Sequence, residues 1–89
     1  MRFQVYLTEF CPYCQMAREL LDRLRYEYQE IRVELEPHER RVMEERSGRT
    51  SVPQIFLGEL HIGGYDELAA LHRSGDLSRM VDEARGSGA

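Results

Sequence analysis

The two cysteines of this 89-residue chain, Cys11 and Cys14, are the side chains best suited to chemistry. Thiols at this spacing can exchange with a disulfide, because one thiolate attacks and the other resolves the mixed disulfide that forms. A disulfide between them would close a very small loop and stabilise the fold little. In a reducing compartment, such a pair therefore indicates redox chemistry or metal binding rather than a structural link.

Two alternatives to redox chemistry remain open. A closed zinc site needs four ligands, and none of the three histidines has the paired spacing of a zinc finger. The cysteines could also be inert and buried. Pro12 suits the first turn of a helix, where unpaired N–H groups and partial positive charge stabilise a thiolate. We therefore expect Cys11 to be the nucleophile and Cys14, one turn later, to be the resolving thiol.

The periodicity of the first half places this motif between a strand and a helix. Apolar residues alternate over 2–7 and again over 31–35, which predicts two strands. Three- and four-residue apolar spacing over 15–28 predicts the helix between them. A charged helix is expected over 38–46, ended by Gly48. The cysteines thus lie where a strand leads into a helix, the sheet edge at which α/β proteins bind ligands.

The second half predicts a hairpin followed by helix. A turn and third strand are expected over 51–57, and a fourth strand over 60–62. A helix follows over 65–72, with one or two further helical turns over 77–84. His61 falls on the fourth strand and is expected to have no catalytic role. The order β-α-β-α-β-β-α predicts an α/β fold with a four-stranded mixed sheet flanked by helices.

Composition and charge exclude several classes of function. The chain has 16 acidic and 12 basic residues, all of the latter arginine, and a net charge of -4, which argues against a nucleic-acid partner. The charged run over 38–49 is typical of a solvated face, although Arg40 and Arg49 are candidates to bind a carboxylate. No apolar run approaches the roughly 20 residues of a membrane span, and residues 1–7 do not resemble a signal peptide. We expect a cytoplasmic monomer without a membrane partner.

Two segments downstream have both a structural and a functional interpretation. Pro53 fits an ordinary strand start, but a cis proline would expose the backbone of Val52 to an extended peptide. Gly64 opens a helix with acidic residues in its first turn, an arrangement that the helix dipole favours by itself. Its N–H groups could instead hold a carboxylate, with Asp66 holding an ammonium group. The cysteine motif favours the functional interpretation of both segments.

Three segments together resemble the dithiol glutaredoxins of bacteria. They are Cys-Pro-Tyr-Cys at 11–14, Thr-Ser-Val-Pro-Gln-Ile-Phe at 50–56 and His-Ile-Gly-Gly-Tyr-Asp-Glu-Leu at 61–68. Residues 46–49, Arg-Ser-Gly-Arg, are also similar to bacterial members, and the resemblance covers roughly residues 3–82. It implies a thioredoxin fold. We expect a glutaredoxin domain over 1–84, and the composition of residues 85–89 predicts a flexible tail.

The resemblance also implies a reaction and its partners. Glutathione would serve as co-substrate, with no metal. Cys11 would form a mixed disulfide with glutathione, and Cys14 would resolve protein disulfides. The expected partners are glutathione and disulfide-containing or glutathionylated proteins, with ribonucleotide reductase as one candidate.

The residues expected to bind glutathione follow from the same resemblance. Val52, before a cis Pro53, would pair with the cysteinyl backbone of glutathione. Residues 64–66 would hold its γ-glutamyl end, and Arg40 would approach its glycyl carboxylate. The complete expected set is Tyr13, Arg40, Ser51, Val52, Pro53, Gly64, Tyr65 and Asp66.

One position departs from the family pattern. The family commonly has a lysine or arginine three residues before the first cysteine, where it stabilises the thiolate and meets the glycyl carboxylate. This chain has Thr8 there, between Leu7 and Glu9, so the local sequence is neutral to acidic. We therefore expect weaker glutathione binding than in a typical member.

Three alternative functions stay open at this point. The first is a glutaredoxin-like hydrogen donor that is reduced by thioredoxin reductase, which the missing basic residue favours slightly. The second is a carrier of a 2Fe–2S cluster, although cluster-binding members usually lack proline after the first cysteine. The third is an adaptor that has lost activity, which the intact Cys11 and Cys14 argue against.

Overall fold

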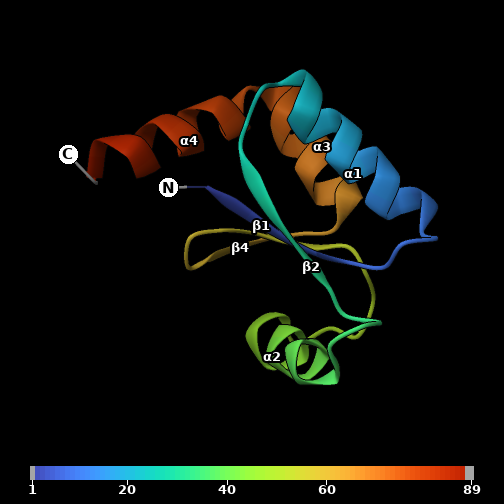
Figure 1. The fold of residues 1–89 in the computed structure, drawn as a ribbon. Coiled ribbons are helices and arrows are strands. Elements are labelled where there is room, and N and C mark those ends of the chain that lie inside the picture. Colours follow the sequence, from blue (N-terminus) through green and yellow to red (C-terminus); the bar gives the residue numbers. More distant parts are fainter. Residues whose placement is uncertain (1, 88–89) are drawn as a thin grey trace.

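Helices cover both faces of a four-stranded sheet in the computed structural model, which describes residues 2–87 (Figure 1). The elements are β1 (Phe3–Leu7), α1 (Pro12–Arg23), β2 (Tyr28–Arg32), α2 (Pro37–Ser47), β3 (Gln54–Leu57), β4 (Leu60–Gly63), α3 (Tyr65–Ser74) and α4 (Asp76–Ser87). The strands lie in the order β2-β1-β3-β4. β1 is parallel to β2 and antiparallel to β3, which is antiparallel to β4. The predicted α/β fold with a four-stranded mixed sheet is confirmed.

The larger hydrophobic core lies between the sheet and helices α1, α3 and α4. β1 contributes Phe3, Val5 and Leu7, whose alternation turns them all to this face. The first of the two cysteines packs against this core, and Cys14 is fully buried within it. The packing of α1 on the sheet therefore also sets the position of the two thiols.

A smaller core lies on the opposite face, beneath α2 (Figure 1). Its centre contains Tyr6, Phe56 and Met43, all fully or almost fully buried. The guanidinium of Arg46 lies 3.9 Å from the centroid of the Phe56 ring. It donates hydrogen bonds to Gln4 Oε1, to the Tyr6 hydroxyl and to the carbonyl of Gly58 at 2.8, 3.0 and 3.1 Å. Arg46 thus links α2 to the sheet.

The predicted boundaries of the first helix and second strand were wrong. The sequence predicted a helix over 15–28 and a strand over 31–35, whereas α1 ends sooner and β2 begins sooner. Arg25 has a left-handed backbone, with φ of 61°, and reverses the chain directly after α1. Tyr28 then pairs with the first residue of β1 instead of extending the helix. Leu35, expected on the strand, is 65% exposed beyond it.

The last helix is longer than the sequence predicted. We expected one or two helical turns over 77–84 and a loose tail over 85–89, but α4 continues to Ser87. Leu77 and Val81, spaced by four residues, are buried in the larger core, and this contact supports a helix of several turns. The last two residues of the expected tail lie outside the described residues.

Replacing Arg46 with methionine should destabilise the fold by about 2 kcal/mol, because three hydrogen-bond acceptors lose a charged donor. Urea unfolding curves of the variant and the parent chain measure this difference. Arg41→Met, on the exposed face of the same helix, is the matched control and should change stability by less than about 0.5 kcal/mol. Equal midpoints for the two variants would contradict the structural role of Arg46.

Candidate active site

Cys11 is the N-cap residue of α1, and the helix start fixes both thiols. Its Sγ accepts a hydrogen bond from the backbone N–H of Cys14 at 3.3 Å, and Pro12 takes the first helical position. Both cysteines are free thiols; Cys11 is partly exposed, whereas Cys14 is buried. The helix dipole and this N–H group favour negative charge on Cys11 Sγ. Cys11, the thiol that a substrate can reach, is therefore also the thiol on which the helix start favours negative charge.

Cys14 is held in its protonated form. Burial, followed by a hydrogen bond with the Cys11 side chain, raises the pKa of Cys14 to about 12, although a hydrogen bond with the Thr8 backbone lowers it. The charges of Cys11 and Glu34 raise it further. Since a thiol is a poor nucleophile, Cys14 cannot attack first.

The second wall of the site is the loop before β3. The peptide bond between Val52 and Pro53 is cis, as expected. Cys11 Sγ lies 3.9 Å from the carbonyl oxygen of Val52, to which the thiol donates a weak hydrogen bond. The nucleophile thus faces the backbone of a residue 41 positions later in the chain.

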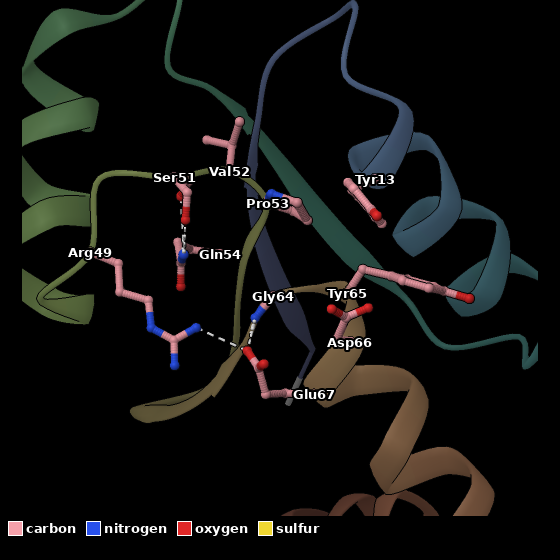
Figure 2. Close-up of a pocket in the computed structure, with 10 residues that line it drawn as sticks. All are labelled: Tyr13, Arg49, Ser51, Val52, Pro53, Gln54, Gly64, Tyr65, Asp66 and Glu67. Atoms are coloured by element: carbon pink, nitrogen blue, oxygen red, sulfur yellow. Dashed lines mark hydrogen bonds and ion pairs between the residues drawn. The ribbon is translucent and has the colours of Figure 1, made fainter.

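A cleft of about 320 Å³ extends from this wall to the start of α3 (Figure 2). The ring of Tyr13, on α1, lies beside that of Tyr65, on α3, with centroids 6.3 Å apart. The loop over 51–53 faces them from the other side (Figure 2). The lining residues are Tyr13, Arg49, Ser51, Val52, Pro53, Gln54, Gly64, Tyr65, Asp66 and Glu67.

The side chain of Glu67 pairs with the first backbone N–H group at the start of α3. Its Oε1 accepts a hydrogen bond from the Gly64 N–H at 2.7 Å and forms an ion pair with Arg49 Nη1 at 2.9 Å (Figure 2). The Gly64 hydrogen bond, followed by that of Arg49, lowers the pKa of Glu67. The Gly64 N–H that we expected to face a ligand carboxylate is therefore already paired with a carboxylate of the chain itself.

Most of the expected binding residues line this one cleft, but Arg40 does not. Its guanidinium donates to the carbonyl oxygen of Thr50 at 3.2 Å, outside the lining set. Arg49, considered beside it as a carboxylate ligand, lines the cleft instead. Gln54 and Glu67 also line it and were missed. The Gly64–Glu67 spacing of a capping box was the sequence signal for Glu67.

Acidic side chains surround the loop before Cys11. Glu34 Oε2 accepts a hydrogen bond from the Glu9 N–H at 2.6 Å. Arg32 forms ion pairs with Glu9 and Glu34 at 2.8 and 3.1 Å. Two carboxylates thus share one guanidinium beside Thr8, so this edge of the site has no excess positive charge.

Within residues 2–87, no group of three or more histidine, cysteine, aspartate or glutamate side chains is arranged to hold a metal ion. Over the same range, none of the helices is both long enough and apolar enough to cross a membrane. Neither finding changes the interpretation of the cleft.

Comparison with known proteins agrees with this geometry. The glutaredoxin family profile matches residues 3–62. A glutaredoxin of Pseudomonas aeruginosa is 43% identical over 77 residues, covering 86% of this chain and 92% of the relative. Glutaredoxin 3 of Escherichia coli K12 is 42% identical over 78 residues, covering 88% and 94%.

The chain belongs to the glutaredoxin family. Its fold agrees with solved glutaredoxins, which confirms the thioredoxin fold. The buckwheat glutaredoxin–glutathione complex superposes with a TM-score of 0.84 and 32% identity, covering 92% of this chain and 77% of the neighbour. The glutaredoxin of Brucella melitensis superposes with a TM-score of 0.78 and 42% identity, covering 90% and 87%. Family and paired thiols together support a thiol–disulfide oxidoreductase.

Alkylation should distinguish the two thiols. Brief treatment of the reduced, folded protein with iodoacetamide at about pH 8 should modify Cys11 alone, because Cys14 is buried and protonated. In denaturant both cysteines should react, and peptide mass spectrometry locates the modification. Equal labelling of Cys14 in the folded protein would contradict the assigned order of the thiols.

Proposed function

We propose that this chain is a glutathione-dependent oxidoreductase that reduces glutathione mixed disulfides and protein disulfides. The observation that carries the proposal is a partly exposed thiol at a helix N-cap, 3.9 Å from the Val52 carbonyl oxygen at one wall of the cleft. The similarity to the buckwheat glutaredoxin that binds glutathione supports the same ligand here. Thr8 favours the thioredoxin reductase alternative slightly, but neither that alternative nor the iron–sulfur carrier is better supported than this proposal.

The cleft is proposed to hold the cysteinyl and the γ-glutamyl parts of glutathione. The backbone of Val52 is proposed to pair with the cysteinyl residue, which brings its sulfur to Cys11. Because Glu67 takes the Gly64 N–H, the γ-glutamyl carboxylate is assigned to the next N–H groups, those of Tyr65 and Asp66, which have no partner within a helix. The side chain of Asp66, exposed in the cleft, is assigned to the γ-glutamyl ammonium group.

The proposed reaction is two successive thiol–disulfide exchanges. The Cys11 thiolate attacks the glutathione sulfur of a mixed disulfide, and the protein thiol leaves as a thiolate that takes up a proton. A second glutathione thiolate then attacks the glutathione sulfur on Cys11. This releases oxidised glutathione and restores the Cys11 thiolate. The net reaction consumes one free glutathione for each protein thiol released, and the second half of the oxidised glutathione comes from the original mixed disulfide.

Protein disulfides additionally require Cys14. Once Cys11 is bound in a mixed disulfide, its thiol no longer raises the pKa of Cys14 by hydrogen bonding or by charge, although burial, the largest cause, still raises it. Cys14 then attacks Cys11, which forms the intramolecular disulfide and releases the reduced substrate. The buried thiol therefore becomes a nucleophile only after the exposed one has reacted.

Arg49 is proposed to supply a positive charge to the cleft, since position 8, where the family commonly has a basic residue, is Thr8. It lines the cleft and is pinned by Glu67 at 2.9 Å, whereas Arg40 donates to a backbone carbonyl outside the lining set. A guanidinium has five donors, and the ion pair recorded here uses one nitrogen. We assign the remaining donors of Arg49 to a glutathione carboxylate, with Arg40 in a lesser role.

The proposal also includes a cytoplasmic location, a monomeric state and disulfide-containing or glutathionylated protein partners. Ribonucleotide reductase remains one candidate substrate. The acidic surroundings of Thr8 support a preference for substrates without a dense negative charge beside their disulfide, because like charges repel at close range.

Turnover of a glutathione mixed disulfide, coupled to glutathione reductase, tests the function. The chain should be active, Cys11→Ser should abolish activity, and Cys14→Ser should retain it while losing reduction of a protein disulfide by the dithiol route. A parallel reaction replaces glutathione and its reductase with thioredoxin reductase. Reduction by thioredoxin reductase alone would replace this proposal with the hydrogen-donor function.

The charge assigned to Arg49 is tested by Arg49→Gln. The KM for the glutathione mixed disulfide should rise about threefold, the size expected for one exposed charge pair, with kcat nearly unchanged. Added salt should raise KM less in the variant than in the parent chain. Arg40→Gln should have a smaller effect, and Arg41→Gln, exposed on α2, serves as the control. A larger effect for Arg40 would reverse the assignment.

A further inference from the structure

A chain of hydrogen bonds connects β4 to the loop that carries Val52. His61 Nε2 lies 2.7 Å from Gln54 Oε1. Gln54 Nε2 donates to the carbonyl oxygen of Ser51 at 3.0 Å and to its hydroxyl at 3.3 Å (Figure 2). Gln54 is fully buried. Its amide oxygen therefore has a partner on the neighbouring strand, His61, and its amide nitrogen has a partner in Ser51, the residue before Val52.

The direction of each hydrogen bond follows from the chemistry of the groups. The amide nitrogen of Gln54 faces the Ser51 carbonyl, an acceptor, so the amide oxygen faces His61. His61 must then donate from Nε2. Burial, followed by the charge of Arg49, lowers the pKa of His61, which favours the neutral ring with its proton on Nε2.

The ring of His61 also has a packing contact. Its centroid lies 4.8 Å from that of Phe56, which belongs to the smaller core. This contact holds the ring in place, but it does not require a nitrogen. Two roles are therefore separable by chemistry: a ring that packs on Phe56 and a donor that orients Gln54.

We infer that His61 and Gln54 are positioning residues for substrate binding, which hold the Ser51 peptide so that the Val52 backbone stays in place for pairing. The inference rests on the proposed function, in which Val52 binds the cysteinyl residue of glutathione. The Gln54 side chain, at the start of β3, connects back to Ser51 through two hydrogen bonds and so links the two ends of the loop over 51–53. Without its donor at His61, the amide can rotate, and the Ser51 carbonyl loses its fixed partner.

Two substitutions of His61 separate the donor from the ring. His61→Phe keeps an aromatic ring beside Phe56 and removes the donor. His61→Gln removes the ring but carries a donor nitrogen, separated from Cβ by the same number of bonds as Nε2 of histidine. If the donor matters, the phenylalanine variant is impaired and the glutamine variant is rescued; if ring packing matters, the order reverses.

Steady-state kinetics with a glutathione mixed disulfide give the first measurement. His61→Phe should raise KM about fivefold with kcat nearly unchanged, the effect of losing one hydrogen bond that supports binding. His61→Gln should stay close to the parent chain. A small aromatic disulfide without a peptide backbone, reacted with the reduced protein in single turnover, should be reduced equally fast by all three. An unchanged KM in His61→Phe, or equal slowing with both disulfides, overturns the inference.

A second measurement does not depend on the proposed function. Backbone order parameters from NMR report mobility of the Ser51 and Val52 amides. They should fall in His61→Phe and remain at the parent value in His61→Gln; equal values in all three chains overturn the inference. If the parent chain fails to turn over the glutathione mixed disulfide, the proposed function fails, and these order parameters still decide whether His61 positions the loop.

Discussion

The burial of Cys14 against the sheet is the contact on which the rest of the site depends. Cys14 lies on the same face of α1 as Ala17 and Leu21, and all three are fully buried in the larger core. Cys11, at the N-cap, lies at the end of this buried face, where it packs against the core and stays partly exposed. The packing of α1 therefore places a partly exposed thiol at the helix start and a buried, protonated thiol one turn later. The different chemistry of the two cysteines follows from their different burial.

The register of the sheet brings the second wall to this thiol. Tyr6, near the end of β1, pairs with Gln54 at the start of β3, and the two strands are antiparallel. The chain before β3 therefore lies beside the chain after β1, which is the segment that leads to Cys11. Val52 reaches the thiol from 41 positions away for this reason. Gln54 contributes to both the sheet and the loop. It is the first residue of β3, and its side chain donates a hydrogen bond to the Ser51 carbonyl in the loop before that strand.

The order of strands and helices was predictable from the sequence because the apolar patterns that indicate them are local. Alternation and three-to-four spacing identified the strands and most helices, and the spacing of the cysteines identified the redox pair. The end of α1 was not predictable in the same way. Tyr28 fits both the spacing of a helix and the alternation of a strand, and Arg25 adopts a left-handed backbone without the glycine that usually signals one. Pairing with β1, a tertiary contact, decides between them.

The residues that line the cleft were predictable where a backbone motif places them, and less so where a long side chain decides the position. The loop over 51–53 and the start of α3 needed only their motifs. The choice between Arg40 and Arg49 depends on where each guanidinium finds an acceptor, and a flexible side chain leaves no local pattern for that. In the fold, Arg40 meets a backbone carbonyl and Arg49 meets Glu67.

The pairing of Arg49 with Glu67 places a positive charge in the wall of the cleft. Glu67 is not only a partner for Arg49; it accepts from Gly64 N–H and so fixes the carboxylate at the start of α3. An arginine held at one nitrogen keeps donors free, whereas an unpinned arginine at the surface would lose side-chain entropy on binding. The carboxylate therefore does not simply cancel the guanidinium. It holds the positive charge in the wall of the cleft in advance of binding.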